Sequence, residues 1–234
     1  IVKSILTKIT GEEGIYNSPT DMGVNMAGYG IVDDETCRAA ARQEIIRRYY
    51  KTACDYKTGN TTADALERIR LLINENKIDL SERKVVAHAL EKAEISGSAS
   101  VAIELENGAF VTGKSNKLMT ACASAALNAV KSLSNIDDDM LLLSPVVLAP
   151  IIQLKKEVLR EDKVKLDLND VLTALSICAA TNPIAEKAMN MLVRLSGCEA
   201  HGSCILPEKD LSVMRKLGVN ITCEPEFGSK DLYG

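Results

Sequence analysis

The sequence has no tryptophan, and its only aromatic residues are two phenylalanines and six tyrosines. So few rings leave little surface on which nucleic-acid bases could stack. A net charge of −4 also differs from the basic footprint of a nucleic-acid-binding domain. No apolar run reaches the roughly 18 residues that a membrane-spanning helix needs. We therefore expect neither a nucleic-acid partner nor a membrane partner.

Histidine is almost absent, with two residues, and the seven cysteines form no C-x-x-C pair. Several of these cysteines fall inside predicted helices, where a free thiol usually behaves as a small buried hydrophobe. An odd number of scattered cysteines is typical of a reducing compartment. We therefore predict a cytoplasmic protein that binds no metal and carries no cofactor.

Residues Gly108–Ser115 read G-A-F-V-T-G-K-S and match the phosphate-loop pattern G-x-x-x-x-G-K-[ST]. A phosphate loop needs backbone N–H groups turned inward around the anion. Phe110, Val111 and Thr112 favour an extended strand instead, and Asn107-Gly108 is a strong hairpin-turn signal. We interpret the segment as a β-hairpin in which 100–106 pairs with 109–113.

The pattern of polarity divides the chain into three regions. Residues 1–34 end in a Gly-rich polar stretch and are predicted to connect to an N-terminal domain that is absent here, since the chain opens on Ile1 rather than Met. Residues 35–96 have helical periodicity and form a predicted helical subdomain. Residues 97–234 alternate strands with helices and predict an α/β domain with a mixed sheet.

The expected elements of the α/β region follow its apolar runs and its proline and glycine positions. Pro145 can open a helix that Pro150 would kink or break. After the hairpin we expect a helix at 118–133, a strand at 140–143, helices at 169–181 and 183–195, a strand at 198–206, a helix at 207–217 and a strand at 219–223.

Four stretches resemble an uncharacterised bacterial family, domain of unknown function 1846. They are T-D-M-G-V-N-M-A-G-Y-G-I-V-D-D (20–34), Q-E-I-I-R-R-Y-Y-K-T-A-C (43–54), T-A-L-S-I-C-A-A-T-N-P (173–183) and K-L-G-V-N-I-T-C-E-P-E (216–226). The resemblance implies that the chain is the C-terminal half of a protein about twice as long. The family has no established activity to transfer.

The order of elements in 97–234 is similar to the cytidine-deaminase-like fold. That resemblance would place Thr120 where an active deaminase has its zinc-binding His, and Cys122 where it has its proton-shuttling Glu. Val146 and Ala149 would replace the two zinc thiolates after Leu143-Ser-Pro145. Thr, Val and Ala cannot hold zinc, so the resemblance implies the fold without the deaminase reaction.

Lys114, Ser115 and Asn116 form the first predicted ligand site. They lie between the hairpin and the helix that follows it. A helix N-terminus can receive an anion, to which Lys114 would add its charge. The alternative is a solvated loop with a helix cap.

Thr20, Asp21 and Asn25 form the second predicted ligand site, within the Gly-rich stretch. This stretch has the polarity and the backbone freedom of a binding loop. The alternative, an ordered connector between domains, stays open.

His201 is the predicted catalytic residue, as a general acid or base on a strand. Strand alternation would put Ser203 on its side of the sheet and Cys204 on the other. A structural histidine is the alternative. Three adjacent carboxylates at Asp137–Asp139 suggest a metal site, but such a run in a turn is usually solvated.

The sequence alone leaves three functions open. The first is a metal-free module that binds an anionic metabolite, in a cleft shared with the absent N-terminal domain. The second is an enzyme on a phosphorylated or nucleotide-like metabolite that uses Lys114 or His201. The third is an architectural half that forms a homo-oligomer through its Ala-rich helices.

Overall fold

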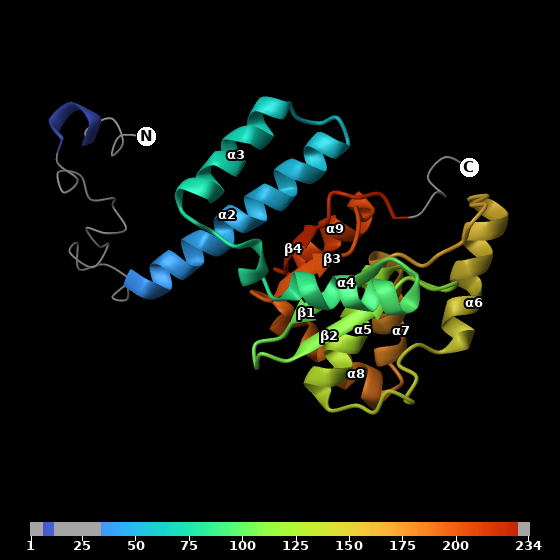
Figure 1. Cartoon of the computed structure of the whole chain (residues 1–234). Coiled ribbons are helices and arrows are strands. Elements are labelled where there is room, and N and C mark those ends of the chain that lie inside the picture. Colours follow the sequence, from blue (N-terminus) through green and yellow to red (C-terminus); the bar gives the residue numbers. More distant parts are fainter. Residues whose placement is uncertain (1–6, 12–33, 229–234) are drawn as a thin grey trace.

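The structure is a computed structural model that describes residues 7–11 and 34–228 (Figure 1). A short helical turn at 7–10 precedes the main body. The α-helices are α2 (Asp34–Lys57), α3 (Ala63–Glu75), α4 (Val85–Ser96), α5 (Ala121–Ser134), α6 (Pro145–Gln153), α7 (Leu168–Ala179), α8 (Pro183–Asn190) and α9 (Glu208–Lys216). The strands are β1 (Ser100–Glu104), β2 (Phe110–Lys114), β3 (Glu199–Gly202) and β4 (Asn220–Cys223). Short 3₁₀ segments, Leu80–Glu82 and Met191–Leu195, and a π-helical segment, Leu154–Val158, extend this set.

The four strands form one mixed sheet in the order β2-β1-β3-β4. β1 runs antiparallel to both β2 and β3, whereas β3 and β4 are parallel. The register aligns Ala102 with His201 and His201 with Thr222, so these three side chains share one face of the sheet. The predicted α/β class with a mixed sheet is confirmed.

Helices cover both faces of the sheet. α4 packs on β1, β2 and β3, and α2 reaches β4 on the same side, while α5 packs on β1 and β2 from the other side (Figure 1). The main hydrophobic core lies between the sheet and α5, α7, α8 and α9. The α2–α3 pair projects from this body and has a small core of its own around Ile46, Tyr50 and Ile78.

The segment 100–114 is a hairpin, as predicted, and its turn differs from the predicted one. The Leu105 carbonyl accepts from the Gly108 N–H at 2.8 Å, and the Leu105 N–H donates to the Ala109 carbonyl at 2.9 Å. Gly108 has φ +77°, while Asn107 does not have a positive φ. This is a turn followed by a glycine bulge rather than a two-residue Asn-Gly turn. Because 110–114 pairs with β1 along its length, it is not a phosphate-binding loop.

The strand predicted between α5 and α7 is absent, and the helix break that Pro150 could have caused does not occur. Residues 140–143 form no strand, because Leu142 and Leu143 insert into the core from an irregular segment, and a short apolar run alone does not define a strand. Pro150 does not end α6, which continues past it and then widens into the π-helical segment. Without a strand at 140–143, the element order that suggested a deaminase-like fold is interrupted.

The helices predicted in 35–96 are present as α2, α3 and α4. Thr62 occupies the N-cap position of α3, although its side chain makes no capping hydrogen bond. The alanines of α5 are buried in the core, so they are not available for the oligomer contacts that the architectural hypothesis assigned to Ala-rich helices. Within 7–11 and 34–228, no helix has the length and apolar character required to cross a membrane.

Substituting Gly113 with alanine should destabilise the fold strongly. A Cβ at Gly113 would lie 2.1 Å from the backbone nitrogen of Ala125, so α5 would have to move away from β2. We expect a loss of about 3 kcal/mol in the free energy of unfolding, as for severe overpacking, measured by urea denaturation. Gly108→Ala is the control: it meets open space and should cost only about 1–2 kcal/mol for its left-handed backbone. A Gly113→Ala protein as stable as the parent would contradict the close packing of α5 on β2.

Candidate functional site

The predicted ligand site Lys114–Asn116 lies at the β2 edge of the sheet, and two of its three side chains, those of Ser115 and Asn116, are hydrogen-bonded within the chain. Asn116 Oδ1 accepts from the N–H groups of Leu118 and Met119 at 2.8 and 2.9 Å. Ser115 Oγ accepts from Lys165 Nζ at 3.0 Å. These contacts fit a structured loop that leads into α5. The other predicted ligand residues, at positions 20, 21 and 25, lie outside the described residues.

His201 is fully buried between the sheet and α2. Its Nδ1 lies 2.8 Å from Thr222 Oγ1 and its Nε2 lies 3.2 Å from Glu224 Oε1. The ring also packs edge-on against Tyr50, with ring centroids 4.8 Å apart. The Ser203 hydroxyl accepts instead from the Ser100 N–H at 2.9 Å, so the pairing of His201 with Ser203 considered from the sequence is not formed.

A neutral His201 has hydrogen-bond partners for both of its ring nitrogens. Arg83 Nε donates to Thr222 Oγ1 at 2.9 Å, the Thr222 hydroxyl can then donate to Nδ1, and Nε2–H can donate to the Glu224 carboxylate. This pattern keeps the imidazole neutral. Burial lowers the pKa of His201, which also favours the neutral form, although Glu224 opposes that effect.

Arg83 is a buried cation that joins several elements. Its Nη2 donates to the carbonyls of Ala200 and Asn220 at 2.8 and 2.7 Å, and its Nη1 pairs with Glu199. Together with the bond to Thr222, four of its five N–H groups are satisfied. Burial lowers the pKa of Arg83, and the Glu199 carboxylate opposes that shift. A buried charge held in this way fixes the two parallel strands to the segment before α4.

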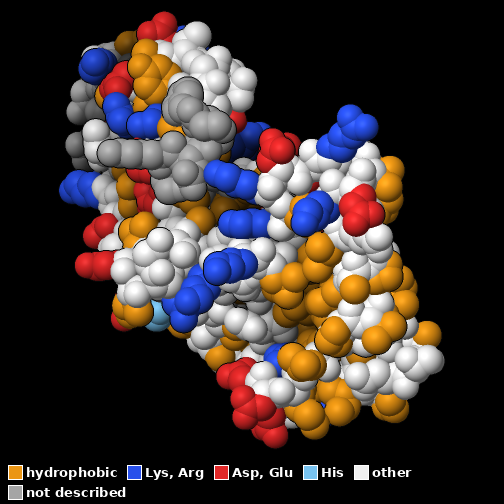
Figure 2. Space-filling view, turned by 90° about the vertical axis from the view of Figure 1, so that its right-hand side faces the viewer, with side chains coloured by type: hydrophobic (Ala, Val, Ile, Leu, Met, Phe, Trp, Pro, Cys, Tyr) orange, Lys and Arg blue, Asp and Glu red, His pale blue; other side chains and the backbone are white. Residues whose placement is uncertain are grey.

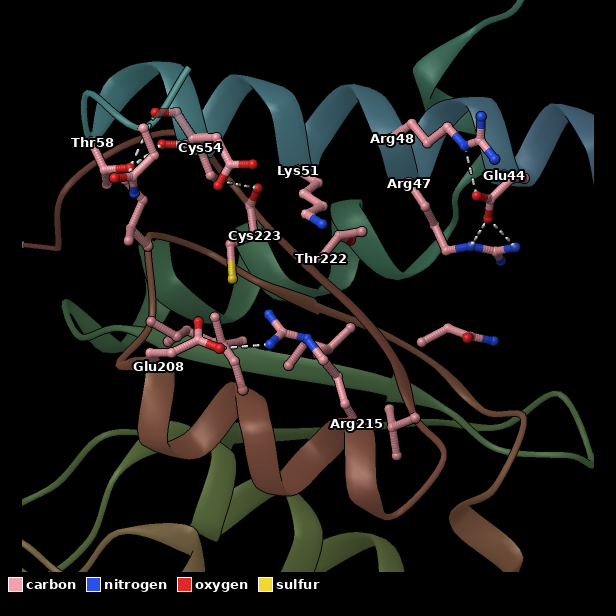
Figure 3. Close-up of a pocket in the computed structure, with 18 residues that line it drawn as sticks. Glu44, Arg47, Arg48, Lys51, Cys54, Thr58, Glu208, Arg215, Thr222 and Cys223 are labelled. Carbon is pink, nitrogen blue, oxygen red and sulfur yellow. Dashed lines mark hydrogen bonds and ion pairs between the residues drawn. The ribbon is translucent and has the colours of Figure 1, made fainter.

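A pocket of about 640 Å³ lies beside this network, between α2 and the β4 edge of the sheet. Figure 3 shows Arg47 and Lys51 extending from α2 and Arg215 from α9, on opposite sides of the space. The floor is apolar and includes Leu206 and Ile221. β4 and β2 are opposite edges of the sheet, so the pocket is distant from the loop at 114–116.

Most charges in the pocket wall are paired with one another. Glu44 pairs with Arg47 at 3.0 Å and with Arg48 at 2.8 Å, and it has a lowered pKa, chiefly because Arg48 hydrogen-bonds to its carboxylate. Arg215 pairs with Glu208 at 2.6 Å. Arg47 also reaches Glu199 at 2.8 Å and so connects the pocket wall to the Arg83 network.

Lys51 and Asp55 differ from the other charged residues of the pocket. Neither has an ion pair or a side-chain hydrogen bond with the part of the chain that the structure describes. They are separated by one helical turn on α2, on the face that lines the pocket. Counting only partners within 7–11 and 34–228, the pocket therefore offers an unpaired ammonium group and, beside it, an unpaired carboxylate.

The pocket thiols are poor nucleophiles. Burial raises the pKa of Cys54 to about 12 and that of Cys223 also to about 12. The Cys54 thiol donates to the Cys223 carbonyl at 3.2 Å, which covers part of the exposed strand edge. These cysteines thus contribute packing rather than thiolate chemistry.

The positions that correspond to a deaminase metal site carry no metal-binding set. Thr120 accepts from the Ala123 N–H as the cap of α5. Cys122 is buried in the core, and burial raises the pKa of its thiol. Among the residues that the structure describes, no group of three or more His, Cys, Asp or Glu side chains could hold a metal ion.

Sequence reasoning missed the pocket almost entirely. The charged residues of α2 that line the pocket have the spacing of ordinary ion pairs on a solvated helix: Glu44, Arg47, Arg48 and Lys51. Arg83 lies in the charged run 82–84, which by itself also indicates a solvated segment. Only the contacts of β4 with α2 on one side and with α9 on the other reveal that these charges face a cavity.

The buried His201 predicts a specific pH dependence of stability. Its pKa in the folded state lies below the ordinary 6.5, so the unfolded chain takes up a proton first as the pH falls. Stability from His201 should be complete above about pH 7 and decline as the pH falls towards 5. We expect a His201→Gln variant to show a smaller decline in urea midpoint over this range than the parent. Equal slopes for the parent and the His201→Gln protein would contradict the assignment.

Comparison with known proteins identifies two family models along the chain. Residues 1–77 match domain of unknown function DUF1846, N-terminal, and residues 81–233 match domain of unknown function DUF1846, C-terminal. The chain therefore contains part of the N-terminal module as well as the C-terminal module that the sequence suggested.

Curated bacterial relatives align with the chain over its full length. A UPF0371 protein of Clostridioides difficile (strain 630) is 48% identical over 241 residues. UPF0371 proteins of Clostridium botulinum are 47% identical in strain Alaska E43 and 48% in strain Langeland. In each case the match covers 100% of this chain and 48% of the relative, so the chain spans about half the length of these relatives. The chain belongs to the DUF1846 family, also called UPF0371.

Proposed function

We propose that this part of the protein binds a small anionic metabolite, without a metal, in the pocket between α2 and α9. The observation that carries the proposal is Lys51, which has no ion-pair partner among the described residues and lies at a cavity of about 640 Å³ with three arginines in its wall. A cavity of this size is in the range of ligand pockets, which combine an apolar lining with a few polar groups. Leu206, Leu211 and Ile221 provide that lining.

The location of the pocket between the two segments that match the family models supports the proposal. The α2 wall of the pocket lies in the segment that matches the N-terminal family model. The α9 and β4 walls lie in the segment that matches the C-terminal family model. Ligand sites are common at such junctions between domains. A ligand here would contact both modules at once.

The charges of the pocket indicate which ligand groups fit. A phosphate or carboxylate can pair with Lys51, and the neighbouring Arg48 can turn to it because its side chain is mostly exposed. Asp55 can accept a hydrogen bond from a hydroxyl or amino group of the same ligand. A phosphorylated sugar has both kinds of group.

His201 has a supporting role in this proposal. Its two ring nitrogens face Thr222 and Glu224, so it orders β4, which forms one wall of the pocket. An enzyme that uses His201 as acid or base would need to expose a ring that is completely buried. The binding proposal needs no such rearrangement.

The proposal is tested by calorimetric titration of the protein with inorganic phosphate, pyrophosphate and glucose 6-phosphate. Lys51→Gln removes one charge-assisted contact, so the dissociation constant of a ligand that binds should rise by about tenfold or more. Lys114→Gln is the control, because this exposed lysine lies at the opposite edge of the sheet and should leave affinity unchanged. An equal effect of the two substitutions, or binding that depends on Lys114 alone, would move the site to the loop predicted from the sequence. No binding of any of the three anions would refute the proposal for this ligand class.

A further inference from the structure

Most charges that line the pocket between α2 and α9 are neutralised by each other. Glu44 pairs with Arg47 and with Arg48 of the same helix. On the other side of the pocket, Glu208 pairs with Arg215. Among the described residues, only two further members of the lining carry a charge. These two residues therefore decide what the pocket offers to a charged ligand.

The two remaining charged residues, Lys51 and Asp55, have opposite charges. Neither has an ion-pair partner within the ranges that the structure describes. Both belong to α2, where four residues correspond to about 6 Å along the helix axis. The pocket thus presents one cationic and one anionic group at neighbouring positions of one wall.

Asp55 is unfavourable in a pocket for a simple anion. A phosphate that pairs with Lys51 lies about one helical turn from the Asp55 carboxylate, and the two negative charges repel each other more strongly once the ligand excludes water. A ligand hydroxyl gives Asp55 a hydrogen bond but no opposite charge. A protonated amine gives it both, and hydrogen bonds between two charged groups are the stronger kind. Asp55 therefore favours an amine over a hydroxyl at this position of the ligand.

The cationic side of the pocket fits a phosphate better than a carboxylate. The Arg48 side chain is 67% exposed and shares Glu44 with Arg47, so it can turn to a ligand while Glu44 keeps a partner. Arg48 and Lys51 are three residues apart and lie on the same side of α2. Together they supply the two positive charges that match a phosphate dianion.

We infer that the ligand of this pocket is a phosphorylated amine, whose phosphate pairs with Lys51 and whose ammonium group pairs with Asp55. This ligand class rests on the proposed function and narrows it. The apolar floor, which includes Leu206 and Ile221, would contact the carbon skeleton between the two charged groups. Asp55 is then the residue that determines specificity, because it distinguishes an amine from the corresponding alcohol.

Two matched pairs of ligands test the inference by calorimetric titration of the whole chain. The members of each pair share a phosphate and differ only in an ammonium group or a hydroxyl: glucosamine 6-phosphate with glucose 6-phosphate, and phosphoethanolamine with 2-hydroxyethyl phosphate. We expect the amine of at least one pair to bind about tenfold more tightly than its alcohol, or better, because an ion pair replaces a neutral hydrogen bond.

The outcomes separate the ligand class from the proposed function. Amines that bind no more tightly than their alcohols in both pairs would overturn the phosphorylated-amine class and leave the anion site standing. Failure of all four ligands to bind would refute both.

Substitution of Asp55 tests whether this residue is responsible for the preference. Asp55→Asn should abolish the preference by weakening the amine and not the alcohol. Lys51→Gln should weaken both members of a pair by the same factor, since it acts on the phosphate that they share. Asp64→Asn is the matched control, because Asp64 is exposed in the first turn of α3, outside the pocket lining. This control should keep the parental preference.

A different role for Asp55 would give a different result. If Asp55 only turns to Lys51 when the pocket is empty, Asp55→Asn would tighten the amine and the alcohol equally. That result, or an equal loss of preference in Asp64→Asn, would overturn the assignment of the ammonium group to Asp55.

Discussion

The buried guanidinium of Arg83 is the interaction on which the arrangement of this protein depends. It binds the carbonyls of both parallel strands, the Thr222 hydroxyl and the Glu199 carboxylate, in a site from which water is almost excluded. A buried charge is tolerated only where its partners are complete, and removing one partner leaves a costly unpaired group. The network therefore tolerates little displacement of β3, β4 or the segment before α4.

The position of α2 follows from this constraint. Glu199 pairs with Arg83 on one side and with Arg47 of α2 on the other, so the charge of the buried network extends into the helix. Arg42 of α2 binds the segment that follows α3, because its guanidinium donates to the carbonyls of Asn76 and Lys77. It also pairs with Glu82 and lowers the pKa of that carboxyl to about 2. With both contacts in place, the charged face of α2 is held over the β4 edge. The pocket is thus a consequence of how the two family modules are joined.

Local signals in the sequence were sufficient to predict much of the fold but little of the candidate site. The hairpin followed from β-branched residues around a glycine turn, and α8 begins at Pro183, the first residue of the helix expected at 183–195. The strand expected at 140–143 failed because apolar residues in an irregular segment can enter a core without pairing. Nothing in the sequence around Arg83 indicated that this residue is buried. A buried arginine cannot be told from a solvated one until the carbonyls that surround it, which are distant in the sequence, are known.

The missing strand and the exposed face of α6 have one physical explanation. In a layered α/β structure, a helix that follows a strand normally covers the sheet and needs only one apolar side. Here the segment before α6 does not join the sheet, and α6 packs mainly on α7 instead. A helix at that position has its second apolar side directed away from the core, where the chain itself provides no cover among its described residues. The outward side of α6 therefore stays apolar and exposed among the described residues (Figure 2), because the segment before it adds contacts to the core without adding a strand that α6 would cover.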